Sequence, residues 1–256
     1  RTGIEKISVS PEDAIKASAE VERTEHEIDE NYLATKKLFI KYAGKMNTGA
    51  IVIYDDLIEF IEQAADMCAD TADYILVLAR NGIDVSDIRK TRTPTTKYRL
   101  KYTGEERSLA LLSKCDPITP QDIKGLRDKA TAIHLGPIAG EISLQTIDEV
   151  AGWKKTVLLD LQGVIRKFDK NGNVSVERNS LLPEMVEKAT IVKTALKEGE
   201  VVTKVSGFEK VGSSLLDMGC KISIVTLGGK GSYVSAYDRE SLFIPAIKPR
   251  RVTDYT

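Results

Sequence analysis

The sequence predicts an α-helical hairpin over residues 1–80, followed by a layered α/β domain over residues 81–256. In the first part, apolar residues recur every three or four positions, which is the period of an amphipathic helix. In the second part, short apolar runs alternate with helical stretches, an order typical of a parallel sheet covered on both faces. Gly and Pro divide in the same way, because the first 80 residues hold three of the 18 Gly and one of the 8 Pro.

Charge changes at the same boundary. Residues 1–80 carry 9 Lys and Arg against 16 Asp and Glu, whereas residues 81–256 carry 28 against 22. The two parts therefore have net charges of −7 and +6, and the whole chain has −1. This asymmetry supports a domain boundary near Arg80.

Composition also limits the class of protein. No apolar run is long enough to cross a bilayer, and the N-terminus lacks a signal-peptide pattern, so the sequence predicts a cytoplasmic protein that is not transmembrane. Nucleic acid is not among the expected partners. The three cysteines, Cys68, Cys115 and Cys220, are widely spaced and odd in number. This pattern predicts reduced thiols in the core rather than disulfides or a thiolate zinc site.

The first helix is expected to begin at Ser10. Ser10 is placed to cap the helix, Pro11 suits the first helical position, and two acidic residues follow in the first turn, where acids are favoured. The helical period continues to about Tyr42. Gly44 and the segment 47–49, which reads Asn-Thr-Gly, then predict a break before the second helix.

The second helix has the more regular apolar pattern. Its apolar residues follow steps of three and four, which places them on one face. The residues are Leu57, Ile58, Ile61, Ala65, Cys68, Ala72, Ile75, Leu76 and Ala79.

The second helix also carries five carboxylates in one stripe, and no Lys or Arg lies between Lys45 and Arg80. Like charges four residues apart destabilise a helix by a few tenths of a kcal/mol, so we expect neutralisation from outside the helix. Facing carboxylates on bundle helices can hold a multinuclear metal site, and the first helix offers a second acidic row. The two rows are Glu59, Glu62, Asp66, Asp70 and Asp73, and Glu22, Glu25 and Asp29.

A second interpretation is that both rows are solvated surfaces. They would then pair with Lys36, Lys37 or Lys41, or with a basic partner. His26 lies within the first row and is expected to be a surface histidine rather than a metal ligand.

Two motifs of the same form lie in these rows, Glu25-His26-Glu27-Ile28-Asp29 and Glu62-Gln63-Ala64-Ala65-Asp66. Residues 12–80 resemble the PhoU-like family of phosphate-transport accessory proteins, whose helical bundles carry such motifs. The resemblance implies Fe or Zn bound by Glu25, Asp29, Glu62 and Asp66, with Asp70 as a supporting ligand. It covers only part of such a protein, so it also implies a homo-oligomer or another partner that completes the bundle.

From residue 81 onward, short strands alternate with helices, and ligands of such sheets bind at the carboxyl ends of the strands. The predicted strands are 97–102, 108–112, 132–135, 156–161, 189–192 and 222–227. The predicted helices are 120–130, 141–152 and 208–218.

Three strand ends carry distinctive segments, which are 134–138 (HLGPI), 160–166 (DLQGVIR) and 226–232 (TLGGKGS). Together with residues 81–88 and 94–109, they resemble the PfkB/ribokinase family of sugar or nucleoside kinases. The resemblance covers residues 81–256. It implies a ribokinase-like parallel sheet with a small β lid over residues 94–112.

The same resemblance implies ATP and Mg²⁺ as cofactors and a sugar or nucleoside as the small-molecule substrate. Glycine at a strand end lets the backbone approach a phosphate or an adenine closely. The implied nucleotide-binding residues are Thr226, Gly228, Gly231 and Glu198. The implied substrate-binding residues are Arg107, Gly136, Asp160, Gln162 and Arg166. Structural roles stay open, because an Asp can cap the next turn and an Arg can lie on the surface of a hairpin.

The chain departs from the family pattern at three places. The Asn-x-x-Glu motif maps onto residues 195–198, where only Glu198 remains, and the N-terminal sugar-binding strand is replaced by the acidic helices. The Gly-Ala-Gly-Asp loop, with its anion hole and general base, would begin after Thr256. No catalytic residue is therefore expected in this chain, and the fragment is expected to be inactive as a kinase.

Two alternatives remain open beside a kinase. One is a metal-binding regulator or accessory of phosphate transport that carries a kinase-derived domain. The other is an artefactual fusion of fragments from two proteins.

Overall fold

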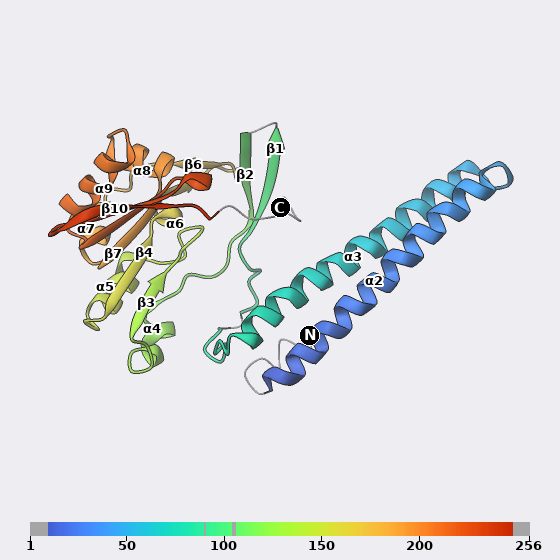
Figure 1. The fold of residues 1–256 in the computed structure, drawn as a ribbon, viewed down its shortest axis with the longest axis horizontal. Coiled ribbons are helices and arrows are strands. Elements are labelled where there is room, and N and C mark those ends of the chain that lie inside the picture. Colours follow the sequence, from blue (N-terminus) through green and yellow to red (C-terminus); the bar gives the residue numbers. More distant parts are fainter. Residues whose placement is uncertain (1–9, 90, 104–105, 248–256) are drawn as a thin grey trace. The chain divides into compact units, whose positions relative to one another are not determined.

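The chain is described by a computed structural model that covers residues 10–89, 91–103 and 106–247, without the side chains of residues 102–107. It divides into two compact units, Arg1–Arg89 and Lys90–Thr256. Figure 1 follows the chain from the blue helices to the red strands. Within the described residues, none of the helices combines the length and apolar content that crossing a membrane requires.

The first unit is a hairpin of two long helices that lie side by side (Figure 1). Helix α2 (Pro11–Tyr42) and helix α3 (Thr48–Arg80) are joined by the short 3₁₀ helix η1 (Ala43–Lys45). The predicted helical region is therefore present, with its break at the predicted place. Asn47 begins α3, because its side-chain oxygen accepts hydrogen bonds from the backbone N–H groups of Gly49 and Ala50 at 2.8 and 3.3 Å. Ser10 occupies the corresponding position of α2 but makes no side-chain capping bond.

Small side chains form the contact between the two helices. Ala14 and Ser18 of α2 are buried, and so are four residues of α3, which are Ala65, Ala72, Ile75 and Ala79. The predicted apolar face of α3 is thus buried only in its second half, since Leu57 and Ile61 are 51% and 50% exposed. Cys68 is also exposed, so the prediction of three core thiols is wrong for this residue and right for Cys220.

The second unit is built on a six-stranded sheet in the order β10-β9-β8-β7-β4-β3. Strands β3, β4, β7 and β8 are parallel, while β9 pairs antiparallel with β8 and β10 pairs antiparallel with β9, so the sheet is mixed rather than parallel throughout. The predicted α/β fold is confirmed, but this antiparallel edge was not predicted. The strands are β3 (Ala132–Leu135), β4 (Thr156–Asp160), β7 (Ile191–Ala195), β8 (Ile222–Thr226), β9 (Gly231–Ala236) and β10 (Arg239–Pro245).

Two small antiparallel hairpins accompany the sheet. The first, β1 (Lys97–Thr103) with β2 (Glu106–Ser113), occupies the region of the predicted lid. The second is β5 (Arg166–Phe168) with β6 (Val174–Val176). The two hairpins touch, because the Leu111 N–H donates to the Gly172 carbonyl at 2.8 Å. Gly172 has φ +81°, and a Cβ there would clash with the Leu111 carbonyl oxygen, so this contact requires glycine.

Helices pack on the sheet around one hydrophobic core. Leu159 of β4 and Val192 of β7 are fully buried together with Ile147, Val211 and Leu215 of the helices. This core packing positions the parallel strands, so that their carboxyl ends lie at one edge of the sheet. The helices are α4 (Pro120–Ile123), η2 (Lys124–Leu126), α5 (Leu144–Ala151), α6 (Gln162–Ile165), α7 (Leu182–Glu187), α8 (Leu196–Thr203), α9 (Phe208–Asp217) and η3 (Gly228–Lys230).

Candidate functional site

The candidate site lies at the carboxyl edge of the parallel strands. Asp160 at the end of β4 pairs in register with Lys193 of β7, and Ala195 at the end of β7 pairs with Thr226 at the end of β8. The segments that the sequence singled out after β3, β4 and β8 are therefore brought to one edge, which is where ligands of such sheets bind.

Asp160 and Lys193 form an ion pair at this edge. The Lys193 Nζ donates to Asp160 Oδ2 at 2.5 Å, and the backbone N–H of Gln162 donates to Asp160 Oδ1 at 3.1 Å. The side chains are 17% and 39% exposed, so the pair is reachable from solvent. Asp160 thus caps the next turn and also presents a charged pair at the strand ends. Lys193 was not predicted, because its role depends on the register between β4 and β7.

Arg166 lies at the centre of a second group of contacts. Its guanidinium is 3.9 Å from Glu198 Oε1 in α8 and donates to the Ile138 carbonyl at 3.4 Å. It also lies over the ring of Tyr98, 5.5 Å from the centroid. The Arg166 side chain is only 7% exposed and that of Glu198 only 16%. Two residues predicted to bind different ligands therefore face each other.

Tyr98 connects the β1–β2 hairpin to this group. Its hydroxyl donates to the same Ile138 carbonyl at 2.6 Å, and its ring lies 6.3 Å from that of Phe168. Burial raises the pKa of the Tyr98 phenol above its ordinary value, although the nearby Arg166 opposes this shift. Tyr98 therefore remains a neutral hydrogen-bond donor at neutral pH.

Glu141 fixes the start of the β1–β2 hairpin and was missed by the sequence analysis. This carboxylate is 5% exposed and accepts hydrogen bonds from Thr96 Oγ1, Ile138 N and Ala139 N at 2.9, 2.9 and 2.7 Å. Burial raises the pKa of Glu141, but the hydrogen bonds, from Ala139 above all, outweigh burial and leave it below its ordinary value. A buried charge this well satisfied holds the loop of Ile138 in place.

Glycine allows the loops after β3 and β4 to touch. A Cβ on Gly163 would clash with the backbone of Pro137, so no other residue fits this position without movement. Gly136 is the residue before Pro137 and lies beside the His134 ring. A cavity of about 370 Å³ opens next to Gly163, and Lys114, Arg166, Phe168 and Asn179 are among its lining residues.

The predicted nucleotide loop lies at the end of β8. The Thr226 hydroxyl donates to the Thr194 carbonyl at 3.4 Å, and Gly228 has φ +59° with open space around it. Gly231 has φ +114°, and a Cβ there would clash with the carbonyl oxygen of Ile244. Gly231 is therefore required by the pairing of β9 with β10, whereas Gly228 faces free space.

Arg107 belongs to β2, but its side chain lies outside the described residues. Its predicted role at the substrate stays a prediction.

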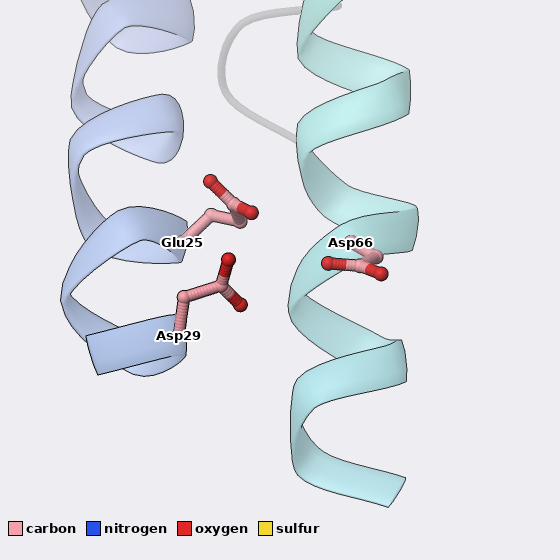
Figure 2. A group of neighbouring side chains, drawn as sticks. All are labelled: Glu25, Asp29 and Asp66. Carbon is pink, nitrogen blue, oxygen red and sulfur yellow. The ribbon is translucent and has the colours of Figure 1, made fainter. Parts of the chain in front are cut away.

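On the hairpin unit, three of the five predicted metal ligands come together. Ligand oxygens of Glu25, Asp29 and Asp66 lie within 4.8 Å of one another, from facing sides of α2 and α3 (Figure 2). Burial and then the charges of Asp29 and Asp66 raise the pKa of Glu25. Glu62 and Asp70 lie outside this group, although burial and then the Asp66 charge raise the pKa of Glu62.

Other charged groups of the hairpin behave as surface residues. His26 is 76% exposed and lies 3.8 Å from Glu30, in agreement with the prediction of a surface histidine. Lys36 pairs with Asp55 of α3 at 2.6 Å, but Asp55 belongs to neither acidic row, so the pairing of the rows with lysines stays a prediction.

Comparison with known proteins identifies the second unit. The family model described as pfkB family carbohydrate kinase matches residues 69–256. The chain belongs to the pfkB family of carbohydrate kinases. The match begins inside α3, so the family resemblance includes the last turns of the hairpin. The resemblance of residues 12–80 to PhoU-like proteins stays a prediction.

Two curated relatives of this pfkB protein are inositol kinases. The inositol 3-kinase of Zea mays is 33% identical over 89 residues, which is 32% of this chain and 23% of that protein. The inositol 3-kinase of Oryza sativa subsp. japonica is 31% identical over 84 residues, which is 30% of this chain and 21% of that protein. The chain thus spans less than a quarter of the length of these relatives.

Solved structures of the ribokinase family share the fold of the pfkB unit. A sulfate complex of a pyrophosphate-dependent kinase has 21% identity and a TM-score of 0.54, over 60% of this chain and 54% of that one. A pyrophosphate-dependent myo-inositol-1 kinase converted into a myo-inositol-3 kinase has 20% identity and a TM-score of 0.56, over 68% and 59%. Ribokinase of Thermotoga maritima has 18% identity and a TM-score of 0.52, over 72% and 58%. At these identities, the likeness shows a ribokinase-like fold.

Proposed function

We propose that the protein transfers a phosphoryl group to a hydroxyl of a cyclic polyol of the inositol class. The observation that carries this proposal is the Asp160–Lys193 pair at the carboxyl edge, a carboxylate and an ammonium group side by side and both reachable from solvent. The local identity with two inositol 3-kinases supports the inositol class over a nucleoside. A nucleoside or another sugar is the alternative within the same family.

In this proposal each charged group binds one part of the reacting molecules. Asp160 accepts a hydrogen bond from a substrate hydroxyl, while Lys193 and Arg166 offer positive charge to phosphate oxygens. Phosphoryl transfer depends mainly on positioning and on electrostatic stabilisation of the transferred group, and these residues supply both. We assign no general base among the described residues.

The phosphoryl donor is proposed to bind at the end of β8. Gly228 leaves open space at the turn, and Thr226 stands at the strand end beside it. The donor is ATP by family resemblance, and pyrophosphate is the alternative that two of the similar structures suggest. Glu198 fits a role in holding Mg²⁺, because its oxygen lies beyond hydrogen-bond distance from Arg166 and can still turn to a cation.

Ligand binding to the 256-residue chain tests the substrate. We expect a saturable increase in melting temperature with myo-inositol and a weaker one with ribose, because a ligand that binds the native state stabilises it. Asp160→Asn should weaken the binding of myo-inositol at least about tenfold, the loss of roughly one charged hydrogen bond. Asp217→Asn, at the exposed end of α9, is the matched control. Equal or stronger binding of ribose would overturn the inositol class.

A second proposed function is metal binding by the hairpin. The cluster of Glu25, Asp29 and Asp66 supports it, since three carboxylates within 4.8 Å repel one another unless a cation is bound. We expect Zn²⁺ or Fe³⁺ to raise the melting temperature of the hairpin, followed by circular dichroism at 222 nm. Asp66→Asn should remove most of that increase. Asp73→Asn, on the same helix but outside the cluster, should leave it unchanged. If Asp66→Asn and Asp73→Asn respond equally, the carboxylates form only a solvated surface.

A further inference from the structure

Helix α3 carries two apolar seams, of which one packs against α2 and the other is largely exposed. The inner seam contains the small buried residues Ala65, Ala72 and Ala79. The second, which we call the outer seam, consists of residues 53, 57, 60, 64, 67, 71, 74 and 78. Their spacing alternates strictly between four and three residues through the length of the helix, and none of them is charged. An apolar repeat of 3.5 residues is the pattern of a helix that packs along another helix.

The outer seam is exposed except at Leu78, which packs against Ala14 and Ala79, although the seam holds the largest apolar side chains of the helix. Ile53, Leu57, Phe60, Met67 and Tyr74 are 68%, 51%, 67%, 70% and 74% exposed. One aromatic side chain buries about 150–250 Å² at an interface, so the seam offers on the order of several hundred Å² per copy. This approaches the roughly 800 Å² per partner of a stable interface.

We propose that the outer seam pairs with the outer seam of a second copy of the chain, antiparallel and related by a two-fold axis. The axis passes between Ala64 and Met67, and the two hairpins form a four-helix bundle. The partner is a second copy because the seam is complementary to itself in size and carries no charge that would repel its copy.

Size complementarity follows from the register of this pairing. Ala64 lies opposite Met67, and Phe60 lies opposite Thr71, so that a small residue faces a large one in the central layers. In a parallel pairing, Phe60 would face Phe60 and Ala64 would face Ala64. The first layer would then be overcrowded, and the second would contain a void. Antiparallel pairing fills the space evenly.

A groove between α2 and α3 receives the bulky side chain. It has a volume of about 560 Å³, and Thr71 and Cys68 line it on α3, with Val21 and Ile28 on α2. Because Thr71 is the position opposite Phe60, the Phe60 ring of the second copy reaches the groove. The lining is mainly apolar, which suits an aromatic ring.

Charge is also compatible with the antiparallel register. The row beside the outer seam contains Asp56, Gln63, Asp70 and Val77. In an antiparallel coiled coil, residues of this row in one copy lie beside residues of the same row in the second copy. Here Asp56 of one copy lies beside Val77 of the other, and Gln63 lies beside Asp70. No carboxylate of this row therefore faces another across the interface, although the helix is strongly acidic.

Sedimentation velocity on the 256-residue chain tests the association. We expect a dimer at micromolar concentration that becomes monomeric on Phe60→Glu or on the uncharged Met67→Ser. Both side chains are two-thirds exposed or more in the single hairpin, so far-UV circular dichroism should show unchanged helicity. Ile40→Glu, at an 80% exposed position of α2 outside the seam, should remain dimeric. A monomeric wild type, or a dimer that survives both seam substitutions, overturns the proposal.

The distance between spin labels tests the orientation. A label at residue 53, in a chain with Cys68 and Cys115 replaced by Ser, should lie about 37 Å along the axis from its copy, because 25 residues separate positions 53 and 78 at 1.5 Å each. A parallel pairing would bring the two labels close together and would overturn the antiparallel register. Neither measurement depends on the kinase function.

Discussion

Arg166 and Glu198 face each other at 3.9 Å, from the first residue of β5 and the first turn of α8. The distance exceeds that of a hydrogen bond, so their interaction is an ion pair in a largely buried setting. The pair joins the β5–β6 hairpin to the helix that follows the central strand β7. A substitution of either residue should therefore affect both the β5–β6 hairpin and α8.

Glu198→Gln should destabilise the pfkB unit. The substitution leaves a nearly buried guanidinium without its counter-charge, and we expect a loss of about 1–2 kcal/mol, less than for a fully buried pair because of the long distance. Fluorescence of Trp153 during urea unfolding measures this, since Trp153 is the single Trp of the chain and lies in this unit. Glu184→Gln is a matched control, because Glu184 lies 3.9 Å from Lys188 but is 48% exposed. Equal losses in the two variants would contradict the burial argument.

Gly163→Ala should disrupt the contact between the loops after β3 and β4. The added Cβ meets the backbone of Pro137, which cannot move as a flexible side chain can. We expect a loss of about 1–3 kcal/mol in urea unfolding and weaker binding of any ligand at the carboxyl edge. Gly125→Ala has open space around it and serves as the control. A Gly163→Ala protein as stable as Gly125→Ala would show that this contact is dispensable.

Glu141 should make the pfkB unit sensitive to acid. Its folded-state pKa is below its ordinary value of 4.5, so the ionised form stabilises the fold at higher pH, and this contribution is lost as pH falls through the folded pKa. The stability difference between wild type and Glu141→Gln should therefore be large at pH 7 and shrink below pH 4.5. Urea unfolding across this range, followed by Trp153, measures it. A difference independent of pH would rule out the carboxylate as its source.

Glu25 should have the opposite effect on the hairpin. Its folded-state pKa is raised, so the protonated form is favoured in the folded state and the metal-free hairpin should become more stable as pH falls from 7 through that pKa. Glu25→Gln should be more stable than wild type at pH 7 and should lose part of this pH dependence. Thermal melts at 222 nm, in low salt with a chelator, measure the effect. Glu27→Gln, which replaces an exposed partner of Arg23, should behave as wild type.

Strands that consist of a short apolar run were predicted close to their observed bounds. The strand at 132–135 was found at its predicted bounds, and β4 and β8 within one residue, because each is a short apolar run between turn residues. Strand β9 and the edge strand β10 were missed. Their sequences contain Gly, Ser and charged residues, and every residue of β10 is exposed, so no alternation marks them.

Contacts that depend on register could not be predicted. Lys193 meets Asp160 because β4 and β7 align in one particular way, although 33 residues separate the two along the chain. The same holds for Glu141, whose partners Thr96 and Ile138 come from different segments. In contrast, the meeting of Glu25 with Asp29 and Asp66 was expected from helical spacing and from the hairpin, while Glu62 and Asp70 lie outside that cluster.

The bond between Leu111 and Gly172 joins β2 to the turn of the β5–β6 hairpin. Since β5 begins with Arg166, this bond connects the β1–β2 hairpin to the strand that carries the guanidinium. In the proposed function, a displacement of the β1–β2 hairpin when substrate binds would therefore be transmitted through β5 to Arg166, and so to the positive charge offered to the phosphate.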